Sequence, residues 1–192
     1  MSVITAKQAL RAAARERRAA WKAAVPDAPA RMAQHFLESI PLAPGTTVSG
    51  YWPIGDEADP LPLLGTLRAR GHAVALPRVA GKSRTPLAFH IYGEGDALVP
   101  GRMGLSEPGA DWTRAIPSVL IVPLLAFDAH GYRLGYGAGY YDATLADLRR
   151  GHGAVAVGYA YEGQEVPDVP HDDHDQRLDW IVTENGVRSC VP

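Results

Sequence analysis

Residues 118–127, SVLIVPLLAF, form the longest apolar run of the chain, and residues 133–142, RLGYGAGYYD, follow shortly after it. The continuous apolar run predicts a strand buried on both faces, which is typical of the centre of a parallel sheet. It is too short to span a bilayer. Glycine weakens helices and strands, so the second segment predicts a loop. That loop follows the carboxyl end of the strand, where open α/β sheets bind ligands.

Helical and strand-like segments alternate on both sides of this pair. Helices are expected over 5–24, 29–39, 60–70 and 140–150, and strands over 46–52, 72–79, 87–92, 153–161 and 178–184. Thr5 and Asp59 are the expected caps of the first and third helices. A poorly defined loop is expected from 93 to about 115. The alternation predicts an α/β fold, a three-layer α/β/α sandwich with a mainly parallel, Rossmann-like central sheet.

Length and composition predict one globular domain over residues 1–192. The chain is 46% hydrophobic and 21% charged, which excludes a disordered protein. Its net charge of −2 argues against nucleic acid or an anionic membrane as a partner. The single cysteine, Cys190, excludes an internal disulfide, and the N-terminus lacks the apolar segment of a signal peptide. We therefore expect a cytoplasmic monomer.

The loop at residues 133–142 contains the parts of a nucleotide site. Its glycines allow successive backbone N–H groups to form an anion nest, and the following helix adds the positive end of its dipole. Arg133 supplies a charged fork for a phosphate, and Asp142 is an oxygen ligand of the kind that Mg²⁺ prefers. The alternative is a tight strand-to-helix turn with Asp142 as the helix N-cap. Residue types alone leave both interpretations open.

This loop differs from two common phosphate-binding signatures. A Walker loop needs a lysine directly after its last glycine, and here Tyr140 follows Gly139. The GxGxxG spacing of dinucleotide-binding folds is also missing. The pattern therefore predicts neither a P-loop nor a dinucleotide fingerprint.

Residues 122–145, VPLLAFDAHGYRLGYGAGYYDATL, resemble the signature of the 5-formyltetrahydrofolate cyclo-ligase family. Further segments resemble the family's other landmarks in the same order: KQALR (7–11), YWPIGDEAD (51–59), VALPRV (74–79), GLSEP (104–108) and PHDDHDQRLDWIVTE (170–184). The resemblance covers nearly the whole chain, and its central motif is long and specific. Ala138 and Ala143 depart from it, since glycine and arginine are common there, and we expect both to tune the loop.

The resemblance implies an enzyme that converts 5-formyltetrahydrofolate, with or without a polyglutamate tail, to 5,10-methenyltetrahydrofolate. ATP would phosphorylate the formyl oxygen, with Mg²⁺ as cofactor, and ADP and phosphate would be released. Phosphorylation makes the formyl carbon electrophilic and gives it a leaving group, so that N10 can close the ring. Both nucleophiles belong to the substrate, and the protein's work is positioning and charge neutralisation.

The resemblance also implies which residues form the site. Lys7 and Arg133 would be catalytic, and Asp142 and Asp175 would hold Mg²⁺. The ATP-binding residues would be Lys7, Arg11, Arg133, Leu134, Gly135, Tyr136, Gly137, Ala138, Gly139, Tyr140 and Tyr141. The folate-binding residues would be Trp52, Glu57, Tyr136, Gly137, Ala138, Gly139 and Tyr140. The roles of Arg78, Glu107, His171 and His174 stay unassigned.

Two of these assignments compete with simpler interpretations. Lys7 and Arg11 share a helix face, where an anion would relieve their repulsion, but Arg15 and Arg18 continue the stripe as in a solvated basic face. Glu57 would accept paired N–H groups of the pterin beside an apolar wall from Trp52. The acidic residues at 56, 57 and 59 would alternatively favour the start of the next helix through its dipole. A zinc site in HDDHD (171–175) is discounted, because these side chains cannot all converge on one ion.

Two rival functions come from other classes. A non-catalytic relative would bind a nucleotide or a folate and regulate another process, although such drift usually erases the catalytic side chains. An RNA-binding protein would use the basic N-terminal helix, but stacking aromatic residues are expected among the arginines and only Trp21 is near. The retained site residues favour the enzyme.

Overall fold

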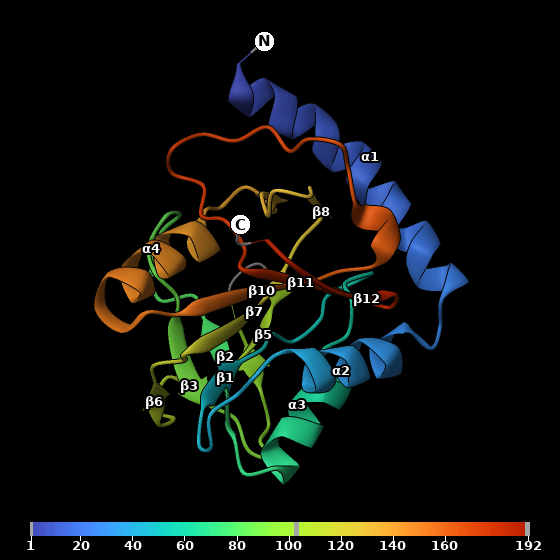
Figure 1. Cartoon of the computed structure of the whole chain (residues 1–192). Coiled ribbons are helices and arrows are strands. Elements are labelled where there is room, and N and C mark those ends of the chain that lie inside the picture. The colour runs from blue at the N-terminus through green and yellow to red at the C-terminus, as the bar shows by residue number, and fades with distance from the viewer. Residues whose placement is uncertain (1, 102–103, 191–192) are drawn as a thin grey trace.

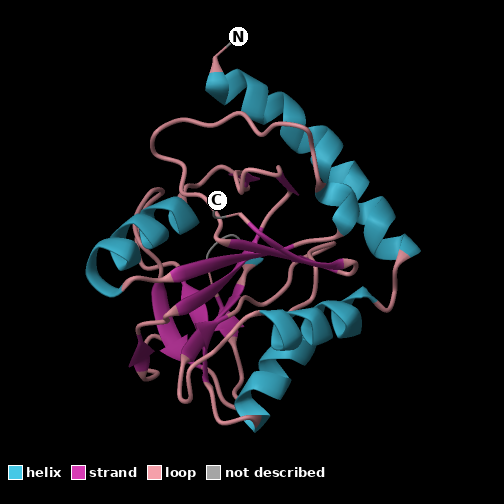
Figure 2. Ribbon diagram, in the orientation of Figure 1, coloured by secondary structure: helices cyan, strands magenta, loops and turns pink. Residues whose placement is uncertain are grey.

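The computed structural model describes residues 2–101 and 104–190 and has a mixed eight-stranded sheet at its centre, shown in Figures 1 and 2. The strand order is β12-β11-β10-β7-β1-β2-β3-β6. The central strands run parallel: β11 (Trp180–Thr183), β10 (Val155–Tyr159), β7 (Val119–Pro123), β1 (Thr47–Ser49) and β2 (Ala73–Arg78). The edge strands are antiparallel: β12 (Gly186–Ser189), β3 (Ala88–Ile91) and β6 (Arg114–Ala115). The predicted α/β class is confirmed, with antiparallel edges added to the parallel centre.

The apolar run that predicts the central strand divides into two pieces. Strand β7 lies between β10 and β1, and Val119 to Val122 are buried on both faces, as predicted. The prediction that the strand continues to residue 127 is wrong, because β7 ends at Pro123, whose ring nitrogen has no proton for the ladder. The chain then leaves the sheet, and β8 (Ala126–Phe127) pairs with β9 (Arg133–Leu134) in a small hairpin. The glycine loop follows directly after this hairpin.

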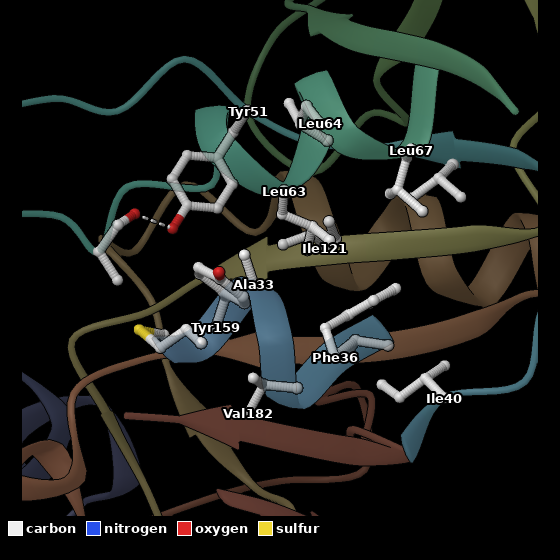
Figure 3. Packing of buried hydrophobic residues seen from close by; sticks show 14 of the residues in the cluster. Ala33, Phe36, Ile40, Tyr51, Leu63, Leu64, Leu67, Ile121, Tyr159 and Val182 are labelled. Atoms are coloured by element: carbon white, nitrogen blue, oxygen red, sulfur yellow. Dashed lines mark hydrogen bonds between the residues drawn. The ribbon is translucent and has the colours of Figure 1, made fainter. Parts of the chain in front are cut away.

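Helices cover both faces of the sheet, which confirms the three layers (Figure 1). Helices α2 (Ala28–Ser39) and α3 (Leu61–Ala69) pack on one face, where Phe36 and Leu67 are fully buried against Ile121. Figure 3 shows this packing at close range. Helix α4 (Tyr140–His152) packs on the other face through Leu145 and Leu148. Each fully buried Leu or Phe side chain stabilises the fold by roughly 1.5–3 kcal/mol.

Helix α1 (Val3–Ala24) belongs to neither layer (Figures 1 and 2). It lies along the carboxyl edge of the sheet, where Ala14 packs against Leu125, Leu134 and Val169. Its predicted N-cap, Thr5, is wrong: Ser2 caps the helix, and its hydroxyl accepts a hydrogen bond from the Thr5 N–H. None of the described helices is both long and apolar enough to cross a membrane.

Three other segments differ from the predictions. The Asp59 carboxylate accepts a hydrogen bond from the Leu61 N–H at 2.9 Å, although the N-cap position itself belongs to Pro60. The expected loop before residue 115 carries the short strands β4 (Val99–Pro100), β5 (Ser106–Glu107) and β6. Strand β12 was not predicted, although Asn-Gly at 185–186 is a strong hairpin signal, and the β11–β12 pair closes there.

Candidate functional site

A buried carboxylate shapes the β8–β9 hairpin that begins the site. Asp128 is fully buried and accepts hydrogen bonds from the backbone N–H groups of His130 and Tyr132 at 2.9 and 3.1 Å. Its other oxygen accepts from the Val169 N–H at 2.9 Å. The three bonds hold the turn against the segment that leads to Asp175, so the glycine loop leaves the hairpin in a defined direction.

The glycine loop connects this hairpin to α4 through two left-handed residues. Gly137 has φ 106° and Gly139 has φ 70°, conformations that side chains other than glycine rarely adopt. Gly139 is the N-cap of α4, and no side chain caps this helix start. The interpretation of Asp142 as the N-cap is therefore wrong. The uncapped first turn presents backbone N–H groups and a positive dipole end, which together suit an anion.

Arg133 ties the hairpin to the first turn of α4. Its side chain is buried, and its two terminal nitrogens donate hydrogen bonds to the Gln176 carbonyl and, at 2.7 Å, to Asp142 Oδ1. The same Asp142 oxygen accepts from the Gln176 N–H at 3.1 Å. Burial lowers the pKa of Arg133, while the charges of Asp142 and Asp175 oppose that shift. The guanidinium thus bonds one predicted Mg²⁺ ligand, Asp142, and is near enough to the other, Asp175, for its charge to act on it.

Helix α1 brings one predicted phosphate ligand to the glycine loop and the other to Asp175. Lys7 Nζ lies 2.7 and 2.5 Å from the two oxygens of Asp175, which is 168 residues away in the chain. Arg11 Nε donates a hydrogen bond to the Gly135 carbonyl at 3.0 Å. The structure therefore brings together Lys7, Arg11, Arg133, Asp142 and Asp175 with the glycine loop.

Most basic residues of α1 donate hydrogen bonds to groups at the carboxyl edge of the sheet. In addition to Lys7 and Arg11, Arg17 donates to the Glu165 carbonyl, Arg18 to the Tyr136 hydroxyl and Lys22 to the Gly55 carbonyl. The interpretation of a solvated basic stripe is wrong for Arg18, which is 5% exposed, and it holds for Arg15. The carbonyl groups and carboxylates at the edge of the sheet attract this cationic helix.

The predicted folate ligand Glu57 lies in a loop held by its own short-range bonds. The Tyr51 hydroxyl donates to the Ala58 carbonyl at 2.5 Å, drawn as a dashed line in Figure 3, and the Ile54 N–H donates to Glu57 Oε2 at 2.9 Å. Glu57 is buried, and burial raises its pKa, although hydrogen bonds from Tyr136 and Ile54 and the charge of Arg18 oppose the rise. The carboxylate that bonds the start of α3 is that of Asp59 and not that of Glu57.

The remaining predicted residues differ in what their side chains can contact. Trp52 and Tyr136 are 37% and 40% exposed, and Trp52 meets Tyr92 edge-on with ring centroids 6.2 Å apart. Tyr140 is half-buried. The Leu134 side chain is buried in the core, so only its backbone atoms remain for a nucleotide, whereas Tyr141 is partly buried and packs against the core. The Ala138 carbonyl accepts a hydrogen bond from the Arg84 N–H at 2.9 Å.

Two carboxylates form the candidate metal site. Within residues 2–101 and 104–190, no group of three or more His, Cys, Asp or Glu side chains is arranged to hold an ion. Mg²⁺ commonly takes one or two carboxylates and completes its shell with phosphate oxygens and water. Both Asp142 and Asp175 are hard oxygen donors, and a Mg²⁺ ion held by the two with further ligands from a nucleotide stays a prediction.

The residues left unassigned have mainly structural contacts. Arg78 lies 3.6 Å from the Glu107 carboxylate and also donates to the Pro108 carbonyl at 2.7 Å. His171 stacks on Tyr132 with ring centroids 3.5 Å apart. The His174 N–H donates to Asp172, within the loop that carries Asp175.

Sequence reasoning missed Arg18, Arg84 and Gln176 as neighbours of the site. Arg84 has φ 61°, and its side chain lies against Gly139, where an added Cβ would come within 2.9 Å of Arg84 Cγ. The polar sequence around Arg84 gives no indication that this residue contacts the glycine loop. For Arg18, the signal was its position on the basic face of α1, seven residues after Arg11.

Comparison with known proteins gives one consistent family. The chain matches the model of the 5-formyltetrahydrofolate cyclo-ligase family over residues 3–184. It is 34% identical over 159 residues to the 5-formyltetrahydrofolate cyclo-ligase of Escherichia coli (strain K12), covering 81% of this chain and 87% of the relative. The enzyme of the same name from Mycolicibacterium smegmatis is 32% identical over 184 residues, covering 92% and 93%.

Solved structures share the fold over nearly the whole chain. The NMR structure of Aquifex aeolicus 5,10-methenyltetrahydrofolate synthetase superposes with a TM-score of 0.73 at 27% identity, covering 100% of this chain and 94% of that one. The 5,10-methenyltetrahydrofolate synthetase of Mycoplasma pneumoniae gives a TM-score of 0.72 at 24% identity, covering 93% and 98%, which supports the fold alone.

Proposed function

The chain belongs to the 5-formyltetrahydrofolate cyclo-ligase family, a family of ligases, and we propose that it converts 5-formyltetrahydrofolate to 5,10-methenyltetrahydrofolate with ATP and Mg²⁺. One observation carries the finer parts of this proposal. Three cations from two distant segments, Lys7, Arg11 and Arg133, lie around the glycine loop at the uncapped start of α4. A polyphosphate is the ligand that such a combination of cations and backbone N–H groups suits.

In this proposal the phosphates of ATP lie over the glycine loop. Residues 135–139 and the first turn of α4 donate backbone hydrogen bonds, and Lys7, Arg11 and Arg133 neutralise the phosphate charge. Asp142 and Asp175 hold the Mg²⁺, which when bound lowers the charge on the transferring phosphoryl group. Lys7 and Arg133 already neutralise these two carboxylates in the protein alone, so each cation can exchange a carboxylate partner for a phosphate.

The folate then supplies both nucleophiles. The formyl oxygen attacks the γ-phosphorus and ADP departs, and N10 next attacks the activated carbon. The N10 proton is lost and phosphate leaves, which closes the methenyl ring. Glu57 accepts N–H groups of the pterin, and the exposed faces of Trp52 and Tyr136 provide apolar walls for its ring. The protein therefore contributes orientation and charge, as is typical of phosphoryl transfer.

Incubation of the purified chain with 5-formyltetrahydrofolate, ATP and Mg²⁺ is expected to produce the near-ultraviolet absorbance of the methenyl product. Oxygen-18 in the formyl group is expected in the released phosphate, because the formyl oxygen becomes a phosphate oxygen. Mass spectrometry of the phosphate measures this transfer. Label retained elsewhere would exclude phosphorylation of the formyl oxygen. Folded protein that binds nucleotide but forms no product would instead support the non-catalytic regulatory relative.

Replacing Gly137 by alanine is expected to raise the KM for ATP about tenfold. Its φ of 106° is strained for any L side chain, and the new Cβ would lie 3.2 Å from the Arg11 guanidinium. Steady-state kinetics with varied ATP measures the change. Gly151→Ala in α4 is the control, since its Cβ meets nothing within 4 Å and alanine favours a helix. An unchanged KM in Gly137→Ala would remove the loop from the nucleotide site.

We further propose that the whole chain acts as one catalytic domain, as a monomer in the cytoplasm. A reducing compartment suits the single cysteine, Cys190, which is buried and whose pKa burial raises to about 11.

A further inference from the structure

Three side chains from distant parts of the sequence form one hydrogen-bonded chain. Arg18 Nη1 of α1 donates to the Tyr136 hydroxyl at 2.6 Å, and that hydroxyl donates to Glu57 Oε1 at 2.7 Å. The same guanidinium nitrogen lies 4.0 Å from Glu57 Oε1. The Tyr136 hydroxyl therefore accepts from a cation and donates to an anion, which polarises both bonds in the same direction.

The two charged ends of this chain are buried. The side chains of Arg18 and Glu57 are 7% and 5% exposed, and Arg18 Nε is a buried donor without a hydrogen-bond partner among the described residues. Tyr136 is different: its hydroxyl reaches the buried pair while the residue stays 40% exposed on the glycine loop. A buried ion pair with an unsatisfied donor is a poor means of stabilising a fold. One member of the pair, Glu57, is the candidate folate ligand, which points to a functional reason for the burial.

We propose that Arg18, acting through the Tyr136 hydroxyl, holds the Glu57 carboxylate as an oriented anion for the pterin ring and thereby sets the affinity for the folate substrate. This inference rests on the proposed function, in which Glu57 binds the folate. Arg18 and Tyr136 are thus positioning residues for Glu57, in addition to any contact of the Tyr136 ring with substrate.

The charge of Glu57 matters because only an ionised carboxylate can accept two N–H groups with both oxygens. Burial raises the pKa of Glu57, whereas Tyr136, the Ile54 N–H and Arg18 lower it. The Glu57 charge acts in turn on the hydroxyls of Tyr51 and Tyr141, whose pKa values burial and that charge raise, so that both stay neutral. Without Arg18 the carboxyl group loses its cation but keeps its burial. The pKa of Glu57 then rises toward neutral pH. Below that pKa the carboxyl group is protonated, and folate binding weakens.

The test compares Arg18→Met with Arg18→Lys and with Arg17→Met as the matched control. Arg17 is the neighbouring residue of the same helix, and its side chain donates to the Glu165 carbonyl instead of to Tyr136. The KM for 5-formyltetrahydrofolate, the KM for ATP and kcat are measured between about pH 6 and about pH 9. Calorimetry without ATP gives the dissociation constant of the folate independently of turnover.

Arg18→Met is expected to raise the folate KM and dissociation constant about tenfold at neutral pH, with the KM for ATP unchanged. The difference from the wild type is expected to shrink as pH rises, because Glu57 then ionises without its cation. Arg18→Lys keeps the charge and is expected to recover most of the affinity, and Arg17→Met to match the wild type. An unchanged folate affinity in Arg18→Met, or a loss that is equal at every pH, would overturn the inference.

Two further variants keep the test decisive if Arg18→Met folds poorly. Tyr136→Phe removes only the bridging hydroxyl from a half-exposed residue and is expected to raise the folate KM by a factor of about three to five. Glu57→Gln cannot ionise and is expected to bind folate weakly at every pH. Wild-type affinity in Tyr136→Phe would also overturn the inference. If the wild type itself does not bind or convert the folate, the proposed function fails first, and the inference falls with it.

Discussion

Arg133→Met is expected to lower turnover of 5-formyltetrahydrofolate by about a hundredfold or more, because one buried guanidinium serves several parts of the site. It binds the Gln176 carbonyl and Asp142, and in the proposed function it neutralises a phosphate. Arg133→Lys keeps the charge but cannot reproduce the planar fork, so we expect an intermediate loss. Stopped or continuous absorbance assays of the methenyl product measure both variants.

The control for Arg133 is another paired arginine, one that is not among the predicted ATP, folate or Mg²⁺ ligands. Arg149 of α4 donates to Asp179 at 2.7 Å and to the Arg177 carbonyl at 2.8 Å, and more weakly to Gln176 Oε1 at 3.3 Å. Arg149→Met is expected to lower the melting temperature without lowering kcat. Circular dichroism separates unfolding from lost chemistry in all three variants. A folded Arg133→Met with wild-type kcat would contradict its catalytic assignment.

Asp142→Asn is expected to raise the Mg²⁺ concentration for half-maximal turnover by about tenfold or more, since loss of even an outer partner of a metal ligand costs that much. The carboxamide oxygen can still accept from Arg133 and from the Gln176 N–H, so the first turn of α4 should keep its shape. Titration of Mg²⁺ in the turnover assay and in ADP binding measures the change. Folate affinity without ATP is expected to stay the same.

Asp147→Asn provides the matched control for Asp142. Asp147 lies on the same helix, is exposed and pairs with Arg150 at 3.5 Å. It is expected to leave the Mg²⁺ dependence unchanged. Equal Mg²⁺ dependence in Asp142→Asn and the wild type would exclude Asp142 as a metal ligand.

The secondary structure that could be predicted depends on short-range patterns. The buried strand at 119–123 follows from its apolar run, and α4 follows from the periodic Leu145 and Leu148. The end of β7 at Pro123 was also readable, since a proline cannot donate to the ladder. The Asn-Gly pair at 185–186 is a strong hairpin signal, so the β11–β12 hairpin could also have been predicted from the sequence.

The site could be predicted only where its residues are neighbours in sequence. Arg133, the glycines and Asp142 occupy one loop, so backbone conformation and charge indicate their roles together. The sequence predicts Arg18 as an exposed cation, because the periodicity of a helix shows which residues share a face but not which segment packs on that face. Its partners come from two other segments, 39 and 118 residues away.

The sequence by itself determined the alternation of strands and helices, the loop that glycine permits, and the family, because each depends on residues that are close together along the chain. Only the tertiary structure decided that Lys7 meets Asp175 and that Arg18 meets Tyr136 and Glu57. These pairs form because α1 docks on the carboxyl edge of the sheet, where several separate chain segments end side by side. Burial there makes the pairing of charges selective, since an unpaired charge away from water costs several kcal/mol.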